Sequence, residues 1–380
     1  MRELEPTGLT IDAIDAATLR AKLPSPVNFG AWRMAYREYV VVRVKVSNGL
    51  EGWAFTLTRD GPVAEAISMW LAARYRGAAL DDPGAAFAQA QRSSLASLSA
   101  GVGLRALSVV DLAVWDALAK AHEISIARLL TGEPASPRPV TAIIGYPPTM
   151  DGEAVGEQTR ELVEAGWRRF KLPISGDREL TLERVEAAAA AAPGCSLAMD
   201  WAWVFDDVEE AARLLEALPA RLDFVEDIFP PGDAERVAAF RRRIPIPVAM
   251  GDEQGGSYYP DALIAAKAVD IVRVDLTCMG GISGARQVIE KAAGAGLSCL
   301  PHMFAHVHSQ AIGALGLADA PVEWGVPWTG VDPYADSLAR PEVDDGLMRP
   351  LPEAPGFGEL VNRDWIGDQE VVADPAGILA

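Results

Sequence analysis

From residue 139 onward the chain repeats one pattern, a short apolar run followed by a longer segment with helical spacing. The runs are TAIIGY, FKLPI, SLAMDW, DFVED, PVAMGD, DIVRVD, SCLPHM and PVEW. The segments between them, such as SGARQVIEKAAGAG, end at a glycine, which is typical of helix termination. Eight strands separated mostly by helices predict an α/β barrel. A doubly wound open sheet would need a glycine-rich phosphate loop after its first strand, and the sequence has neither G-x-G-x-x-G nor a P-loop.

The first part of the chain is organised differently. YVVVRVKV and WAFTL flank the turn SNGLEG, which is typical of a β-hairpin, and helical patterning runs from about Val63 to His122. The stretch GEPASPRP, at 132–139, is rich in turn residues and indicates a boundary. We therefore predict an α+β domain over 1–138, the barrel over 139–342, and a C-terminal segment, 343–380, that packs back on the first domain.

Charge and composition exclude several classes of protein. The 34 basic and 53 acidic residues give a net charge of −19, which disfavours nucleic acid or an anionic membrane as a partner. Three scattered cysteines indicate a reducing compartment. The N-terminal region lacks the apolar stretch of a signal peptide, and no apolar run reaches membrane-spanning length. We expect a cytoplasmic protein that acts on small molecules, with no nucleic acid and no membrane partner.

Each predicted barrel strand from the second onward places one ionisable group where its apolar run stops. The carboxyl ends of barrel strands converge on one mouth, where active sites lie. A single carboxylate at such a position would be an ordinary solvated loop residue. Ionisable residues that recur at the same point of seven successive strands are hard to explain in that way. The seven groups are Lys171, Asp200, Glu226, Asp252, Asp275, His302 and Glu323.

Three of these groups predict a metal site. Asp200, Glu226 and Asp252 come from three adjacent strands, and carboxylates so close together repel one another unless a cation neutralises them. Oxygen ligands without a nearby Cys or His favour Mg²⁺ over Zn²⁺. Neighbouring residues of a strand point to opposite faces, so only one of Asp252 and Glu253 can face the metal. The strand-end register favours Asp252, and Glu253 is the alternative. Such an ion would also attract a carboxylate substrate to an acidic protein.

The remaining groups predict proton abstraction. An imidazole that is hydrogen-bonded to a carboxylate is held in one tautomer, so Asp275 would orient His302 as a general base. Glu323, if protonated, and Lys171, as a cation, could each donate to an oxyanion. Together these groups describe removal of the proton α to a carboxylate.

The same order of groups resembles the enolase superfamily, and the Asp275–His302 pair with Glu323 is similar to its mandelate racemase subgroup. The strings AMDW, FVED, MGDE, RVDLTCMGG, PHMF and VEW support this, as do VVVRVKVSNGLEGWAF and SVVDLAVWDALAKA in the N-terminal part. The resemblance implies a (β/α)7β TIM-like barrel with an N-terminal α+β capping domain, Mg²⁺ as cofactor, a small-molecule carboxylate substrate and a homo-oligomer.

Departures from the family pattern narrow the reaction. Pro173 stands where racemases usually carry a second, basic lysine, Cys278 where lactonising enzymes and dipeptide epimerases have a lysine, and Ala202 where galactonate-type dehydratases have a histidine. With His302 as the one obvious base, we predict dehydration of an acid sugar, an aldonate or an aldarate, by β-elimination to a 2-keto-3-deoxy acid. A racemase or epimerase of a 2-hydroxy acid and a catalytically silent barrel that serves as a binding protein remain as alternatives.

Further residues near the predicted mouth have secondary roles. Arg59, Asp60 and the early loop at 28–33 could line a lid over the substrate or belong to an ordinary surface loop. Asp227 would support Lys171 or the metal site. Core packing is expected for Trp201 and Trp203. Structural or rim roles are expected for His306 and His308, and leaving-group acid or substrate contact is the alternative.

Overall fold

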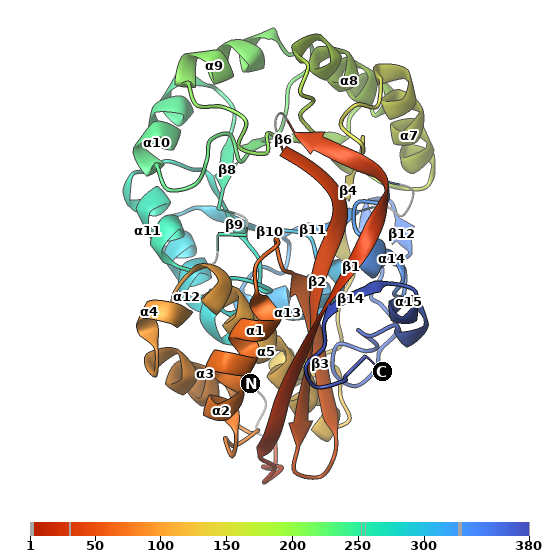
Figure 1. The fold of residues 1–380 in the computed structure, drawn as a ribbon. Helices are drawn as coiled ribbons and strands as arrows, with labels where there is room; N and C mark the ends of the chain where they lie inside the picture. The colour runs from red at the N-terminus through yellow and green to blue at the C-terminus, as the bar shows by residue number, and fades with distance from the viewer. Residues whose placement is uncertain (1–3, 30–31, 252, 255, 326–328, 380) are drawn as a thin grey trace.

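The computed structural model describes residues 4–29, 32–251, 253–254, 256–325 and 329–379. The expected hairpin is present as β2 (Trp32–Val46) and β3 (Glu51–Leu57). A third long strand, β1 (Ile11–Phe29), pairs antiparallel with β2 and was not predicted. Its Pro24 and Pro26 argue against a regular strand, and the structure accommodates them where the β1–β2 register shifts between Lys22 and Val27. Figure 1 shows β1 and β2 as a long twisted ribbon that crosses in front of the barrel.

The capping helices pack on one face of this sheet. The long helix α5 (Gly101–Ala121) is buried along most of its length, because it contacts β2 and β3 on one side and the barrel helix α12 (Gly281–Gly294) on the other. Asp116 of α5 accepts hydrogen bonds from the amides of Trp53 and Phe357. No described helix combines the length and the apolar character needed to cross a membrane. The other capping helices are α1 (Val63–Ala66), η1 (Ile67–Leu71), α2 (Ala72–Tyr75), α3 (Pro83–Arg92), α4 (Leu95–Leu98) and α6 (Ile126–Thr131).

The close approach of β3 to α5 gives a test of this packing. A Cβ added at Gly52 would lie 2.1 Å from the carbonyl oxygen of Ala113 and 2.6 Å from the amide nitrogen of Ala117. We therefore expect Gly52→Ala to lower the free energy of unfolding by roughly 1–3 kcal/mol, measured by urea denaturation. The matched control is Gly294→Ala at the end of α12, where a Cβ would meet nothing within 4 Å. Equal stability of the two variants would contradict the packing.

Eight parallel strands follow, and helices connect each strand to the next (Figure 1). They are β4 (Arg138–Ile143), β5 (Arg169–Pro173), β6 (Ser196–Asp200), β7 (Val225–Glu226), β8 (Val248–Met250), β9 (Ile271–Val274), β10 (Ser298–Pro301) and β11 (Val322–Gly325). The helices between them are α7 (Gly152–Glu164), α8 (Arg178–Ala191), α9 (Val208–Ala217), α10 (Ala234–Arg243), α11 (Tyr258–Ala265), α12, and α13 (Ala305–Ala311) with η2 (Ile312–Leu315).

The strand order favours the barrel over the open sheet. Neighbours from β4 to β10 pair in chain order, and the last strand, β11, pairs with the first, β4, with Gly325 opposite Ile143. A doubly wound sheet would instead reverse its order at a switch point. Among the described residues no ladder joins β10 to β11, although the two strands contact each other. The predicted α/β class is confirmed.

The C-terminal region is divided between the two halves of the molecule. After α14 (Pro333–Asp336), β12 (Val343–Asp344) and β13 (Leu347–Met348) form a small hairpin, and β13 pairs with the beginning of β4. After α15 (Arg363–Gly367), β14 (Glu370–Ala373) pairs antiparallel with β1 in the capping sheet. The proposed boundaries at residues 138 and 342 remain predictions.

Candidate active site

At the carboxyl ends of the barrel strands, six of the seven expected groups lie in two clusters, and the side chains within each cluster contact one another. One cluster contains Lys171, Asp200, Glu226 and Glu323, and the other is the Asp275–His302 pair. The seventh group, Asp252, lies outside the described residues. Both clusters reach the same cavity, which Lys171, Asp200 and His302 line from the barrel side.

Lys171 is the centre of the first cluster. Its Nζ lies 2.8 Å from Oε1 of Glu226, 2.9 Å from Oε1 of Glu323 and 3.9 Å from Oδ2 of Asp200. Burial alone would lower the pKa of this ammonium, but the neighbouring carboxylates outweigh burial and raise the pKa above its usual value. Lys171 is therefore a fixed cation at the mouth.

Arg273 completes this cluster and was missed in the sequence. It lies on β9 inside the barrel, where its Nε is 3.1 Å from Oε2 of Glu226 and its Nη2 donates to Glu323. The side chain is 1% exposed. A signal was available, since an arginine interrupts the apolar run DIVRVD two residues before Asp275, and alternate residues of a strand share a face.

The structure corrects the role expected for Glu323. Its carboxylate accepts hydrogen bonds from Lys171, from Arg273 and from the amide of Met303. Burial would raise its pKa, but Arg273 and Lys171 hold the pKa well below the usual range. In this structure Glu323 is therefore an acceptor in contact with Lys171, and its part in catalysis stays a prediction. The expected donor role required a protonated carboxyl, which this environment opposes.

The acidic side of the cluster suits a hard cation. Asp200 and Glu226 are register partners on β6 and β7, so their side chains leave the sheet in the same direction. Glu226 is fully buried, and burial raises its pKa to about 7 despite Arg273 and Lys171. No three acidic, histidine or cysteine side chains within the described part of the chain form a complete metal cluster. The two described carboxylates nevertheless supply the oxygen donors that Mg²⁺ prefers.

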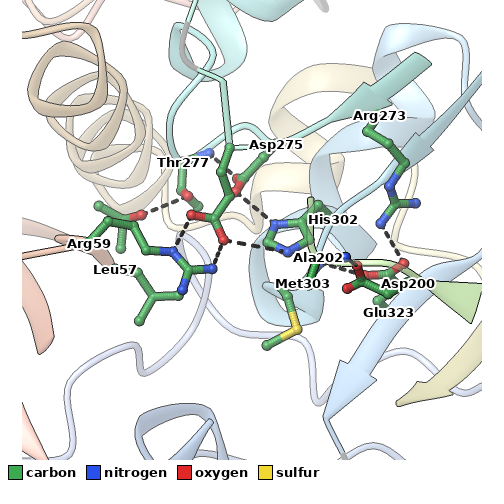
Figure 2. Close-up of polar contacts among 12 residues, drawn as sticks. Leu57, Arg59, Asp200, Ala202, Arg273, Asp275, Thr277, His302, Met303 and Glu323 are labelled. Carbon is green, nitrogen blue, oxygen red and sulfur yellow. Dashed lines mark hydrogen bonds and ion pairs between the residues drawn. The ribbon is translucent and has the colours of Figure 1, made fainter. Parts of the chain in front are cut away.

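Asp275 and His302 form the expected pair. Oδ2 of Asp275 lies 3.3 Å from Nδ1 of His302, and its Oδ1 accepts from the amide of Thr277 at 2.7 Å (Figure 2). Burial would raise the pKa of Asp275, but its hydrogen bond to His302 and the nearby imidazole charge keep the pKa lowered. The carboxylate thus holds Nδ1 of the ring, while Nε2 lies 3.6 Å from Oε1 of Glu253.

Glu253 connects the barrel to the capping domain. Its carboxylate is ion-paired with Arg59, lies 3.3 Å from Nη2 of Arg105, and is 3.6 Å from Nε2 of His302. Burial opposes the charge, but Arg59 and then His302 and Arg105 hold the pKa of Glu253 well below its usual range. Arg59 does face the cavity, as a lid residue would, whereas the early loop includes residues outside those described.

His306 and His308 have the structural roles expected for them. The Nε2 of His308 accepts the amide of Leu276 at 3.1 Å, and its Nδ1 lies 2.6 Å from the carbonyl oxygen of Met303. This pattern requires the neutral ring and ties the loop after β9 to the loop after β10. His306 bonds the carbonyl oxygen of Ala339 and packs on Trp324.

The two tryptophans after β6 differ. Trp201 is fully buried against Phe205 and Phe240, as expected for a core residue, whereas Trp203 lines the cavity. Asp227 also lines the cavity, and its Oδ1 accepts the amide of Gly251 at 3.4 Å.

Residues that sequence patterns did not identify complete the cavity wall. Tyr146 follows β4. A tyrosine carries no charge at neutral pH, so the pattern of charged residues at strand ends does not include it. Burial raises the pKa of its hydroxyl, and the charge of Asp200 adds to this effect. The capping domain contributes Met34, Arg37 and Leu57, beside the expected Arg59.

Two family descriptions match the chain. Residues 13–131 match "Mandelate racemase / muconate lactonizing enzyme, N-terminal domain", and residues 154–365 match "Enolase C-terminal domain-like". The first covers the capping domain, and the second covers most of the barrel and part of the C-terminal region.

Individual relatives carry several different activities. The chain is 27% identical to a D-galactarolactone cycloisomerase of Agrobacterium fabrum over 94% of this chain and 97% of that protein. It is 26% identical to an arabinonate dehydratase of Saccharolobus solfataricus over 71% and 73% of the two chains. The solved structure of L-talarate/galactarate dehydratase from Salmonella typhimurium LT2, liganded with Mg and L-lyxarohydroxamate, has a TM-score of 0.84 at 19% identity and covers 97% and 96%.

Proposed function

Because the chain belongs to the enolase superfamily, with the mandelate racemase and muconate lactonizing enzymes, we propose that it dehydrates an acid sugar. The reaction removes the proton α to the carboxylate, eliminates the 3-hydroxyl and gives a 2-keto-3-deoxy acid. The observation that carries this proposal is the one-sided arrangement of the base. His302, held by Asp275, faces the same cavity as Lys171, whose amine is bound by Glu226 and Glu323.

One base favours elimination over inversion. A racemase needs proton-transfer groups on both faces of the carbon, because the proton leaves from one side and returns to the other. Among the described residues of the cavity wall, His302 is the one imidazole and Lys171 the one lysine. Since two carboxylates hold the Lys171 amine, it serves as a cation, and Pro173 stands at the position of a second lysine.

Each residue has one task in the proposed reaction. Nε2 of His302 takes the α-proton while Asp275 holds the opposite ring nitrogen. Lys171 stabilises the negative charge that develops on the substrate carboxylate. The protonated His302 then returns its proton to the departing 3-hydroxyl. Mg²⁺, held by Asp200, Glu226 and the proposed third ligand Asp252, would supply further positive charge beside that carboxylate.

The relatives support this class of substrate without defining it. The name of the cycloisomerase contains an aldarate lactone, and the name of the arabinonate dehydratase contains an aldonate. The structure of the talarate/galactarate dehydratase, which has the same fold, contains Mg. The names of the relatives differ in the reaction, so the products would distinguish a cycloisomerase, a racemase and a dehydratase.

The proposal predicts Mg²⁺-dependent formation of a 2-keto acid. Purified protein would be incubated with a panel of aldonates and aldarates in D₂O, with product measured as its semicarbazone and deuterium by NMR. We expect 2-keto acid from at least one member, loss of turnover after treatment with EDTA, and recovery when Mg²⁺ is restored. Inversion without loss of water would establish a racemase, and no exchange with any acid would favour the catalytically silent barrel. Either result would overturn the proposal.

A further inference from the structure

Arg37 of β2 lies against the cavity in an unusual environment. The residue is 7% exposed, and its Nε donates to the carbonyl oxygen of Val331 at 2.9 Å. Its Nη1 is buried and has no hydrogen-bond partner among the described residues. Buried guanidinium nitrogens are normally hydrogen-bonded, because an unmade bond costs the full desolvation of the group.

Within the described part of the chain, the guanidinium of Arg37 also has no counter-ion. No described carboxylate lies within ion-pair distance of it. Asp332 is the acid that acts on it electrostatically, but this carboxylate accepts from the Tyr39 hydroxyl at 2.6 Å and caps α14 through Ala335. Burial and the nearby charge of Arg59 lower the pKa of Arg37. A buried charge without a partner is costly, so the site is built for an anion that enters the cavity.

The surroundings of Arg37 are cationic. A groove along β2 continues the cavity outward and is lined by Arg33, Arg37 and Arg59 together with the acids Glu38 and Asp60. Glu38 is engaged elsewhere, since its carboxylate pairs with Arg20 at 2.9 Å and accepts from Thr58 at 2.8 Å. Arg59 is paired with Glu253, so an anion at Arg37 would find the positive charge of Arg33 and Arg37 against the one remaining acid of the described lining, Asp60.

One residue relates this cationic wall to the proposed reacting end. Tyr146 lines the same cavity as Asp200 and Lys171 of the barrel and as Arg37 and Arg59 of the capping domain. A substrate whose first carboxylate lies at Lys171 would pass Tyr146 and extend toward Arg37.

We propose that Arg37 is a specificity-determining residue that binds the second carboxylate of a diacid, so that the substrate is an aldarate rather than an aldonate. This inference rests on the proposed dehydration. A terminal hydroxyl could accept one hydrogen bond from Nη1, but it would leave the buried charge unneutralised, whereas a carboxylate would do both.

The test compares acids that differ only at the far end: D-glucarate with D-gluconate, and galactarate with D-galactonate. For the Mg²⁺-loaded wild type we expect a larger kcat/KM for a diacid than for its monoacid. Arg37→Met should lower kcat/KM for the diacid by about 10–100-fold, mainly through KM, and should affect the monoacid much less. The matched control is Arg43→Met on the same strand, whose guanidinium pairs with Asp15 at 2.8 Å. We expect this variant to keep the wild-type ratio.

A binding measurement separates this inference from the reaction. In the His302→Asn background with Mg²⁺, a diacid should raise the thermal midpoint more than its monoacid, and Arg37→Met should remove that difference. Arg37→Lys, which keeps the charge but not the planar fork, should retain part of it and serves if the methionine variant fails to fold. Dehydration of aldonates in preference to aldarates, or equal losses for both acids in Arg37→Met, would overturn the role of Arg37 while leaving the dehydration intact. Failure of every acid sugar to react would overturn the dehydration itself.

Discussion

Replacing His302 with asparagine should abolish both exchange of the substrate α-proton with D₂O and release of 2-keto acid. Asparagine keeps a polar side chain of similar size but cannot accept the proton, so the variant loses general-base catalysis, which is worth about 10²–10⁴-fold in rate. Because the Asp275 carboxylate also accepts from the amide of Thr277 and lies 3.8 Å from Nε2 of His308, the loop after β9 should stay in place without the His302 contact.

If His302 both removes the α-proton and protonates the leaving hydroxyl, the variant should lose α-proton exchange and release of 2-keto acid together. His122→Asn is the matched control, since His122 is the C-cap residue of α5 in the capping domain and should not affect either rate. Exchange at the wild-type rate in His302→Asn would exclude His302 as the base. Exchange lost with dehydration retained would contradict the order of steps.

Replacing Arg273 with methionine should cost about 3–5 kcal/mol of folding free energy, the range found when one partner of a buried ion pair is removed. Arg273 is the only described cation besides Lys171 that contacts Glu226 and Glu323, and both carboxylates are almost fully buried. Without it, Lys171 alone must compensate two buried charges. The thermal or urea midpoint of the metal-free protein measures the effect without reference to catalysis.

Two further variants separate buried charge from general loss of packing. Arg243→Met removes an exposed arginine paired with Glu216 on the surface of the barrel and should leave the midpoint unchanged. Arg273→Met combined with Glu323→Gln removes the excess negative charge that Lys171 cannot compensate and should recover part of the lost stability. An unchanged midpoint in the single variant, or no recovery in the double variant, would show that the ion pairs contribute little.

Local sequence was sufficient for the barrel and for most of its mouth. The strand period and the convergence of carboxyl ends turn a linear pattern into a spatial prediction, which is why Asp275 contacts His302 and why Asp200 and Glu226 lie side by side at the mouth. The contacts of Lys171 with Glu226 and Glu323 were not predicted. The family and the capped-barrel fold predicted from these residues are confirmed by the two matched domains. The roles proposed for the individual residues await the variants described above.

Long-range contacts account for what the pattern missed. β1 contains two prolines and was not recognisable as a strand, but its pairing with β2 and with the distant β14 stabilises it. The ionised state of Glu323 could not be anticipated either, because it depends on Lys171 and Arg273 from other strands. A protonated donor and an ionised acceptor have the same sequence and differ only in their neighbours.

By itself, the sequence determined the alternation of strands and helices and the ionisable residue at each strand end, because both follow from the local period of the chain. Only the tertiary structure placed Arg37 beside the cavity and showed its guanidinium buried without a carboxylate partner among the described residues. Arg37 reads in the sequence as one more polar strand residue. Its significance depends on burial and on partners hundreds of residues away, such as the carbonyl oxygen of Val331, and no local pattern records these.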